Sequence, residues 1–68
     1  MEMTIKACRA QVRVSADELG KAIGVTKDTI YAWETGKRSP SIKYAFKIVD
    51  FFNKQGLGVT LNDINFLP

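Results

Sequence analysis

The sequence contains no histidine and a single cysteine, Cys8. Without histidine, one chain cannot assemble a Ser-His-Asp triad, a Cys-His pair or the usual zinc and haem ligand sets. A single cysteine has no partner for an internal disulfide, and no stretch approaches the 18 apolar residues that a membrane span requires. We therefore expect no enzymatic activity, cofactor, metal or small-molecule substrate, and a cytoplasmic protein that does not enter a membrane.

The chain is also short, and its charge is modest. A chain of 68 residues buries only about 60% of the surface that its unfolded form exposes, so we expect one domain over residues 1–68. The formal net charge is +3, and every basic residue except Lys54 lies within the first 49 positions. This distribution favours a polyanionic partner, although a solvated basic surface gives the same pattern.

Apolar residues recur at helical spacing in every long segment, which predicts an all-α fold. We expect a first helix over residues 4–12 with Ile5, Cys8 and Val12 buried. Cys8 fits a small apolar core residue, with a thiol sensor as the alternative. A second helix follows the capping box of Ser15 and Glu18 and ends at residue 24.

The third and fourth helices are delimited by capping residues. Thr26 and Gly36 are expected to bracket a third helix over Lys27–Thr35, with Ile30 and Trp33 facing inward. A fourth helix is expected from near Pro40 to about residue 55. Its predicted inward residues are Ile42, Ala45, Phe46, Val49 and Phe52.

The fourth helix carries a second apolar strip, and the chain ends in an apolar tail. Tyr44, Ile48 and Phe51 form this strip, which predicts either a dimer contact or a surface covered by the tail. Thr60 is expected to cap a last short helical turn through Ile64. Residues 65–68 are expected to pack back on the fourth helix or against another subunit.

Two charged residues fall on faces that should be buried. Arg9 lies on the apolar stripe of the first helix, and Glu34 lies on the inward side of the third. Two opposite charges on buried sides of neighbouring helices are most simply explained if they pair with each other. We predict a partly buried, bidentate ion pair that ties the two helices together.

The second and third helices are separated by only three residues, Gly24-Val25-Thr26. Two short helices joined by such a turn are typical of a helix-turn-helix, and Gly20 supplies the small residue where the helices cross. The outward side of the third helix carries Asp28, Tyr31, Ala32 and Thr35, without a large aliphatic residue. This composition indicates a surface that contacts a polar partner.

These segments resemble the phage-repressor or Cro-like helix-turn-helix family, also called XRE-type. The resemblance covers residues 5–64 and is most specific in the stretch Trp33-Glu34-x-Gly36-Lys37-x-x-Pro40. It implies a compact five-helix, lambda-repressor-like domain whose third helix enters the DNA major groove. It also implies a sequence-specific transcriptional regulator that binds double-stranded DNA as a homodimer. Short members of the family are often Cro-like repressors from phages or mobile elements.

The resemblance also assigns contacts to individual residues. The expected base-contacting residues are Lys27, Asp28, Thr29, Tyr31 and Ala32. The expected phosphate-contacting residues are Ser15, Ala16, Lys37, Arg38, Ser39, Lys43 and Tyr44. Members of the family also often pair an arginine of the first helix with the glutamate that corresponds to Glu34.

Three positions depart from the family pattern. Ala16 stands where glutamine is common, Gly20 stands where alanine is usual, and residues 53–57 intervene before the last helix. The last difference bears on how a dimer would form. A protein-interaction module or antitoxin on the same fold is the alternative function.

Overall fold

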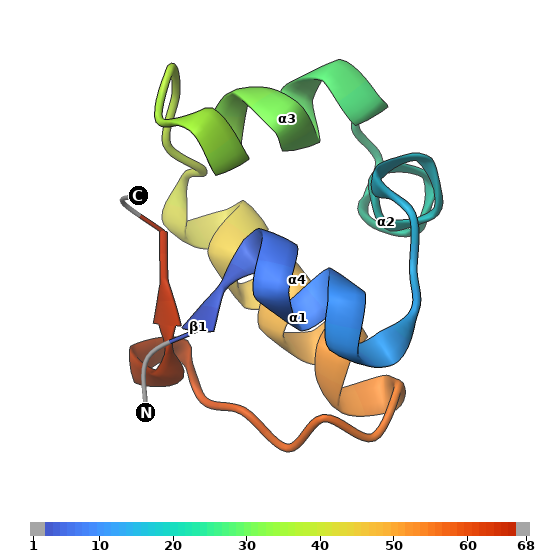
Figure 1. Ribbon diagram of the computed structural model, residues 1–68. Coiled ribbons are helices and arrows are strands. Elements are labelled where there is room, and N and C mark those ends of the chain that lie inside the picture. The colour runs from blue at the N-terminus through green and yellow to red at the C-terminus, as the bar shows by residue number, and fades with distance from the viewer. Residues whose placement is uncertain (1–2, 67–68) are drawn as a thin grey trace.

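The computed structural model describes residues 3–66 and contains four α-helices within them (Figure 1). The helices are α1 (Ile5–Val12), α2 (Ala16–Ile23), α3 (Lys27–Thr35) and α4 (Ile42–Lys54). A short 3-10 turn, η1 (Leu61–Asp63), follows α4. Two-residue strands β1 (Met3–Thr4) and β2 (Ile64–Asn65) pair in parallel, with Met3 opposite Ile64.

Each of the four helices begins at a hydroxyl side chain. The side chains of Thr4, Ser15, Thr26 and Ser41 each accept a hydrogen bond from the backbone N–H three residues later. These bonds satisfy donors that the first turn of a helix leaves without a partner. The predicted starts of the first three helices are therefore correct.

The predicted all-α class is confirmed by a mostly helical structure, but the predicted fifth helix is wrong. After Gly58 only the three residues of η1 adopt a helical conformation, and Ile64 lies in β2 rather than at the end of a helix. The backbone N–H and the hydroxyl of Thr60 both donate to the Asp63 carboxylate, at 2.8 and 3.1 Å. So short a segment gains too few helical hydrogen bonds to continue, and pairing with β1 satisfies the backbone that follows.

One apolar core lies between the four helices and is closed by the C-terminal segment. Its fully buried side chains include Leu19, Ile30, Ile48 and Phe52. Val12, which we expected to be buried, is half-buried and packs at the edge of this core. The core fixes the orientation of α3 because Ile30 and Trp33 are both buried in it.

The orientation predicted for α4 is wrong at two positions. Ile42 and Phe46 were expected to face inward, but they are 64% and 57% exposed. Ile48, from the strip that we assigned to a dimer contact or to the tail, is fully buried in the core of the chain itself. Because α4 is apolar on two sides, the sequence pattern does not determine which side packs on α2 and α1.

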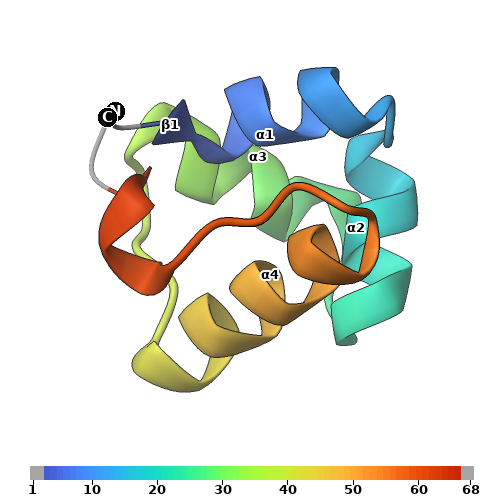
Figure 2. The same cartoon turned by 90° about the horizontal axis from the view of Figure 1, so that it is seen from below.

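The C-terminal segment passes between α1 and α4, as Figure 2 shows. Val59 and Ile64 are buried in the core, and Phe66 is half-buried against it. Both polar groups of the Asn53 side chain bind the Val59 backbone: the amide donates to the carbonyl at 2.8 Å, and the oxygen accepts from the N–H at 2.6 Å. The tail therefore packs back on the domain as far as Phe66, and residues 67–68 of the predicted tail lie outside the described range.

Candidate nucleic-acid interface

The α2–α3 pair is held together by a close backbone contact at Gly20. The backbone N–H groups of Gly24 and Val25 both donate to the Gly20 carbonyl at 2.8 Å. A Cβ atom at residue 20 would lie 2.5 Å from the Val25 carbonyl oxygen. Gly24 ends α2 with a φ of 89°, in the left-handed region that favours glycine. These local contacts fix the conformation of the turn and thereby the direction of α3 relative to α2.

The outward side of α3 is exposed and polar. Lys27, Asp28 and Tyr31 are exposed, and Ala32 is half-buried. A shallow hollow of about 470 Å³ lies along this side. Its lining residues are Asp28, Tyr31, Ala32, Thr35, Lys37 and Arg38. The structure thus brings three predicted base-contacting residues together with two predicted phosphate-contacting residues.

Thr29 lies on a different side of α3. Its hydroxyl is 3.2 Å from the Thr26 hydroxyl, and its backbone N–H donates to that same oxygen. It lines a second hollow of about 300 Å³ between α3 and the start of α4. The residues around this hollow are Val25, Thr29, Trp33, Arg38, Ser39, Ser41 and Tyr44. Thr29 is therefore grouped with predicted phosphate-contacting residues rather than with Asp28 and Tyr31.

Hydroxyl groups and a guanidinium surround the second hollow, and these are typical phosphate donors. Our sequence-based assignment missed Ser41, although its place before a helical stretch marks it as a helix cap. It accepts a hydrogen bond from the Tyr44 N–H at 3.4 Å. Arg38 lines both hollows and so stands between the two sides of α3.

Tyr44 links the core to the basic side of α4. Its ring centroid is 5.7 Å from that of Trp33. The ammonium groups of Lys43 and Lys47 lie 5.8 and 5.5 Å from the centre of the Tyr44 ring. Cation–π attraction of this kind holds both charges beside the ring of Tyr44, which itself lines the second hollow. Lys47 is a further candidate contact that our sequence-based assignment missed, and its spacing of four residues from Lys43 is a signal for it.

Of the two phosphate contacts predicted at the start of α2, Ser15 is already engaged within the chain and Ala16 is buried. The Ser15 hydroxyl accepts from the Glu18 N–H at 3.0 Å, and the Ser15 N–H donates to the Glu18 carboxylate at 3.2 Å. Ala16 is only 2% exposed. A phosphate at this end of α2 would have to compete with the Glu18 carboxylate for the Ser15 N–H.

Arg9 and Glu34 form a bidentate ion pair between α1 and α3. The Arg9 Nε–Glu34 Oε2 distance is 2.7 Å, and the Arg9 Nη2–Glu34 Oε1 distance is 3.1 Å. The remaining Arg9 Nη1 donates to the Val14 carbonyl at 3.1 Å. The hydrogen bond to Glu34 and the charge of its carboxylate raise the pKa of Arg9 above its ordinary value. The pair joins α3 to α1.

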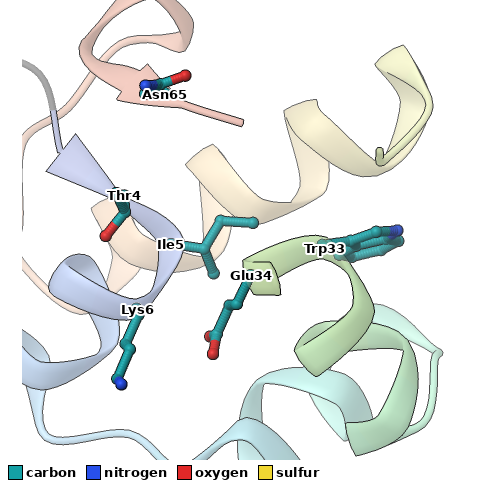
Figure 3. Close-up of a pocket in the computed structure, with 6 residues that line it drawn as sticks. All are labelled: Thr4, Ile5, Lys6, Trp33, Glu34 and Asn65. Atoms are coloured by element: carbon teal, nitrogen blue, oxygen red, sulfur yellow. The ribbon is translucent and has the colours of Figure 1, made fainter. Parts of the chain in front are cut away.

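Glu34 borders a hollow on the side of α3 that faces α1 (Figure 3). Figure 3 shows the Glu34 side chain extending toward the helix that carries Lys6, whereas the Trp33 ring extends away from it. Thr4 caps α1, and Glu34 is held by Arg9. This hollow of about 200 Å³ is therefore part of the seam between α1, α3 and β2.

Cys8 lies on the inward side of α1 and is fully buried in the core. Burial raises the pKa of the Cys8 thiol, which keeps the sulfur in its protonated, unreactive form. The structure thus favours the core role over the thiol-sensor alternative. Separately, none of the helices within residues 3–66 combines the length and the apolar character needed to cross a membrane.

Comparison with known proteins agrees with this geometry. A helix-turn-helix family model matches residues 5–63. An uncharacterised HTH-type transcriptional regulator of Methanocaldococcus jannaschii is 42% identical over 94% of this chain and 89% of its own length. Similar regulators from Archaeoglobus fulgidus and Bacillus subtilis are 43% and 38% identical, each over 78% of this chain and over 75% and 80% of their own lengths. No solved structure gives a significant match. The chain therefore belongs to the XRE-type helix-turn-helix family.

Proposed function

We propose that this protein is a sequence-specific, double-stranded DNA-binding transcriptional regulator that inserts α3 into the major groove. The relatives named as transcriptional regulators support this function. The proposal extends to a homodimer that acts as a Cro-like repressor, of phage or mobile-element origin. A protein with this function works in the compartment that holds the DNA, which in a prokaryotic cell is the cytoplasm.

The exposed polar side of α3 is the observation that carries the proposal. An α-helix with its side chains fits the width of the major groove, and base edges there present both donors and acceptors. Lys27 offers a donor for guanine, Asp28 offers an acceptor for cytosine, and Tyr31 offers apolar contact to a thymine methyl group. All three side chains are exposed, and none of them contributes to the core.

Basic and hydroxyl side chains flank α3 where the sugar-phosphate backbone would run. The residues proposed for this contact are Lys37, Arg38, Ser39, Lys43 and Tyr44. Thr29 and Ser41 are added from their positions around the second hollow, and Lys47 is added from its place over the Tyr44 ring. Ser15, in competition with Glu18, and the Ala16 N–H are proposed as contacts at the start of α2. Contacts of this kind fix the position of the protein on the duplex, whereas α3 reads its sequence.

Selection from a pool of randomised duplexes tests the proposal. We expect enrichment of one sequence with two related half-sites about one helical turn apart, as two copies of α3 require. Affinity for the selected duplex should fall steeply between about 50 and 200 mM salt, because each neutralised phosphate releases counterions. An absence of selected sequences at low salt would reject the proposal in favour of a protein-interaction module or antitoxin.

A reporter assay tests the proposed repression separately. The selected sequence, placed across a promoter, should lower expression when the protein is supplied. Increased expression would show an activator and would leave the DNA-binding function intact. The same assay with a scrambled half-site is the control.

A further inference from the structure

A groove between α2 and α4 is separate from the two hollows beside α3. It has a volume of about 400 Å³ and lies where the end of α2 meets the second half of α4. Among the described residues, none that lines this groove also lines either hollow beside α3. We call it the α2–α4 groove, and the side chains that define it here are Lys21, Ile23, Lys47, Asp50, Phe51 and Lys54.

The floor of the α2–α4 groove is apolar. Ile23 is 4% exposed, and Phe51 is half-buried. Phe51 belongs to the second apolar strip of α4, whose other members have partners elsewhere: Ile48 is fully buried in the core, and the Tyr44 ring lies 5.7 Å from that of Trp33. The part of Phe51 that the core does not cover therefore faces the groove.

The rim of the groove is basic. On α4, Lys47, Asp50, Phe51 and Lys54 follow one another at spacings of three, one and three residues, which places them on a single side of the helix. Lys21 faces this side from the last turn of α2. The charged residues that line the groove are thus three lysines and one aspartate.

Two of these lysines are held only by exposed ion pairs. Lys21 lies 3.2 Å from the Asp17 carboxylate, and Lys54 lies 3.0 Å from that of Asp50. The two lysine side chains are 79% and 73% exposed. Water screens such pairs, so they contribute little to stability. Carboxylates from another molecule can therefore take up both ammonium groups at small cost.

The combination of an apolar floor and a basic rim selects the chemistry of an occupant. A nucleic-acid backbone offers charge but no apolar surface to cover Phe51, and the Asp50 carboxylate would repel it. An acidic amphipathic helix offers both features, because its apolar side covers the floor while carboxylates on its flanks reach the rim. The groove also runs between two packed helices, as in other sites that receive a helix.

We propose that the α2–α4 groove binds an acidic, amphipathic helix of a partner protein. Apolar side chains of this helix pack on Ile23 and Phe51, and its glutamate or aspartate side chains pair with Lys21 and Lys54. Lys47 stands at the border, because its ammonium group also lies 5.5 Å from the centre of the Tyr44 ring. The contact does not depend on DNA binding, and it leaves the outward side of α3 open.

A displayed library of helical peptides about 18 residues long tests the proposal. The library has apolar residues on one side of each helix, and the flanking positions vary among glutamate, lysine and serine. Selection on the full chain should enrich peptides with glutamate on both flanks. Enrichment of lysine or serine flanks, or no enrichment at all, would overturn the proposal.

Charge reversal on the rim locates the binding site of an enriched peptide. Lys21→Glu and Lys54→Glu should each weaken peptide binding about 5-fold, measured by fluorescence anisotropy. Lys6→Glu, which makes the same change at an exposed position of α1, is the matched control and should stay within about 2-fold of wild type. In the wild-type chain, amide chemical-shift changes should centre on Ile23 and Phe51. Equal losses in all three variants, or shifts centred on α3, would place the peptide elsewhere and overturn the proposal.

An excess of duplex DNA separates this contact from the proposed function. With the duplex bound to the chain, affinity for the peptide should stay within about 2-fold of its value without DNA, as two separate sites require. Displacement of the peptide by the duplex would assign the groove to the DNA-binding surface and overturn the proposal. If the chain binds no duplex, the proposed function fails, and the rim variants still decide the peptide site.

Discussion

Gly20 shows how one small residue positions α3. Alanine has the higher helix propensity by about 1 kcal/mol, so propensity alone favours alanine in the middle of α2. However, the space that a Cβ atom would occupy is taken by the backbone of the following turn. The Val25 carbonyl oxygen would lie 2.5 Å from that atom, and the Thr26 carbonyl carbon would lie 3.2 Å away. Packing therefore outweighs propensity at this position.

We predict that Gly20→Ala destabilises the domain by about 2 kcal/mol, because the clash is with backbone that cannot move without shifting α3. Urea unfolding followed by circular dichroism measures this change. Ala22→Gly, at an exposed position of the same helix, is the control and should cost about 1 kcal/mol through propensity alone. A Gly20→Ala variant as stable as the wild type would show that the turn relaxes easily.

The second residue-scale prediction concerns Glu34. Its side chain is 7% exposed and that of its partner Arg9 is 14% exposed, so removing the carboxylate leaves a guanidinium in a largely dry site. We expect Glu34→Ala to lower the free energy of unfolding by about 3 kcal/mol. Thermal and urea unfolding measure the loss.

The exposed pair of Asp50 and Lys54 provides a matched control for the ion pair. Its N–O distance is 3.0 Å, and both side chains are more than half exposed. Asp50→Ala should change stability by less than about 1 kcal/mol, because solvent screens such a pair. If Glu34→Ala and Asp50→Ala lowered the free energy of unfolding equally, burial of the Arg9–Glu34 pair would not increase the cost of breaking it.

At the scale of elements, the connection after α4 is held by a side chain in place of regular secondary structure. Asn53 binds both the N–H and the carbonyl of Val59, as a neighbouring strand would. Val59 is 8% exposed, so its backbone groups have little access to water. This contact explains how residues 53–57, a departure from the family pattern, are accommodated without a longer helix.

We predict that Asn53→Ala lowers the free energy of unfolding by about 1–3 kcal/mol, because it leaves two backbone groups of Val59 without their partner. Asn62→Ala, at an exposed asparagine of η1, should stay within about 0.5 kcal/mol of wild type. Urea unfolding compares the two variants. Similar stabilities for both would mean that water replaces the Asn53 amide at no cost.

At the scale of the whole molecule, the charges separate into internal and external sets. Arg9 is neutralised by Glu34, and the exposed pairs Lys21–Asp17 and Lys54–Asp50 neutralise two further lysines. The basic side chains around α3 and the start of α4 are Lys27, Lys37, Arg38, Lys43 and Lys47. A net charge of only +3 therefore understates the positive potential on this side.

Substitutions on this side should separate sequence reading from phosphate contact. Lys27→Ala should relax selectivity at one base position, with a cost of about 1–3 kcal/mol against the preferred base. Arg38→Ala should weaken binding to all sequences about equally and reduce the magnitude of the log–log salt slope by about 1. Titrations against the selected duplex and its single-base variants measure both effects. The reverse pattern would mean that α3 does not read the bases.

The sequence by itself determined the first three helices, their N-terminal caps and the pairing of the buried charges. A capping hydroxyl or glycine interacts with backbone groups only a few residues away in the sequence. Ser15, Thr26 and Gly24 therefore mark helix ends without contacts from the rest of the fold. The same local rules locate α3, its outward polar side and the turn before it. Helical periodicity also placed Arg9 and Glu34 on buried sides, and opposite charges there need a partner.

Only the tertiary structure decided what depends on contacts between distant residues. It turned Ile48 rather than Phe46 into the core, grouped Thr29 with Ser41 and Tyr44, and converted the expected last helix into a turn and a strand paired with β1. In each case, the outcome depends on which of two similar surfaces of a segment packs against another part of the fold. Local sequence patterns leave such choices open, because the competing arrangements differ only in the packing of segments far apart in the chain.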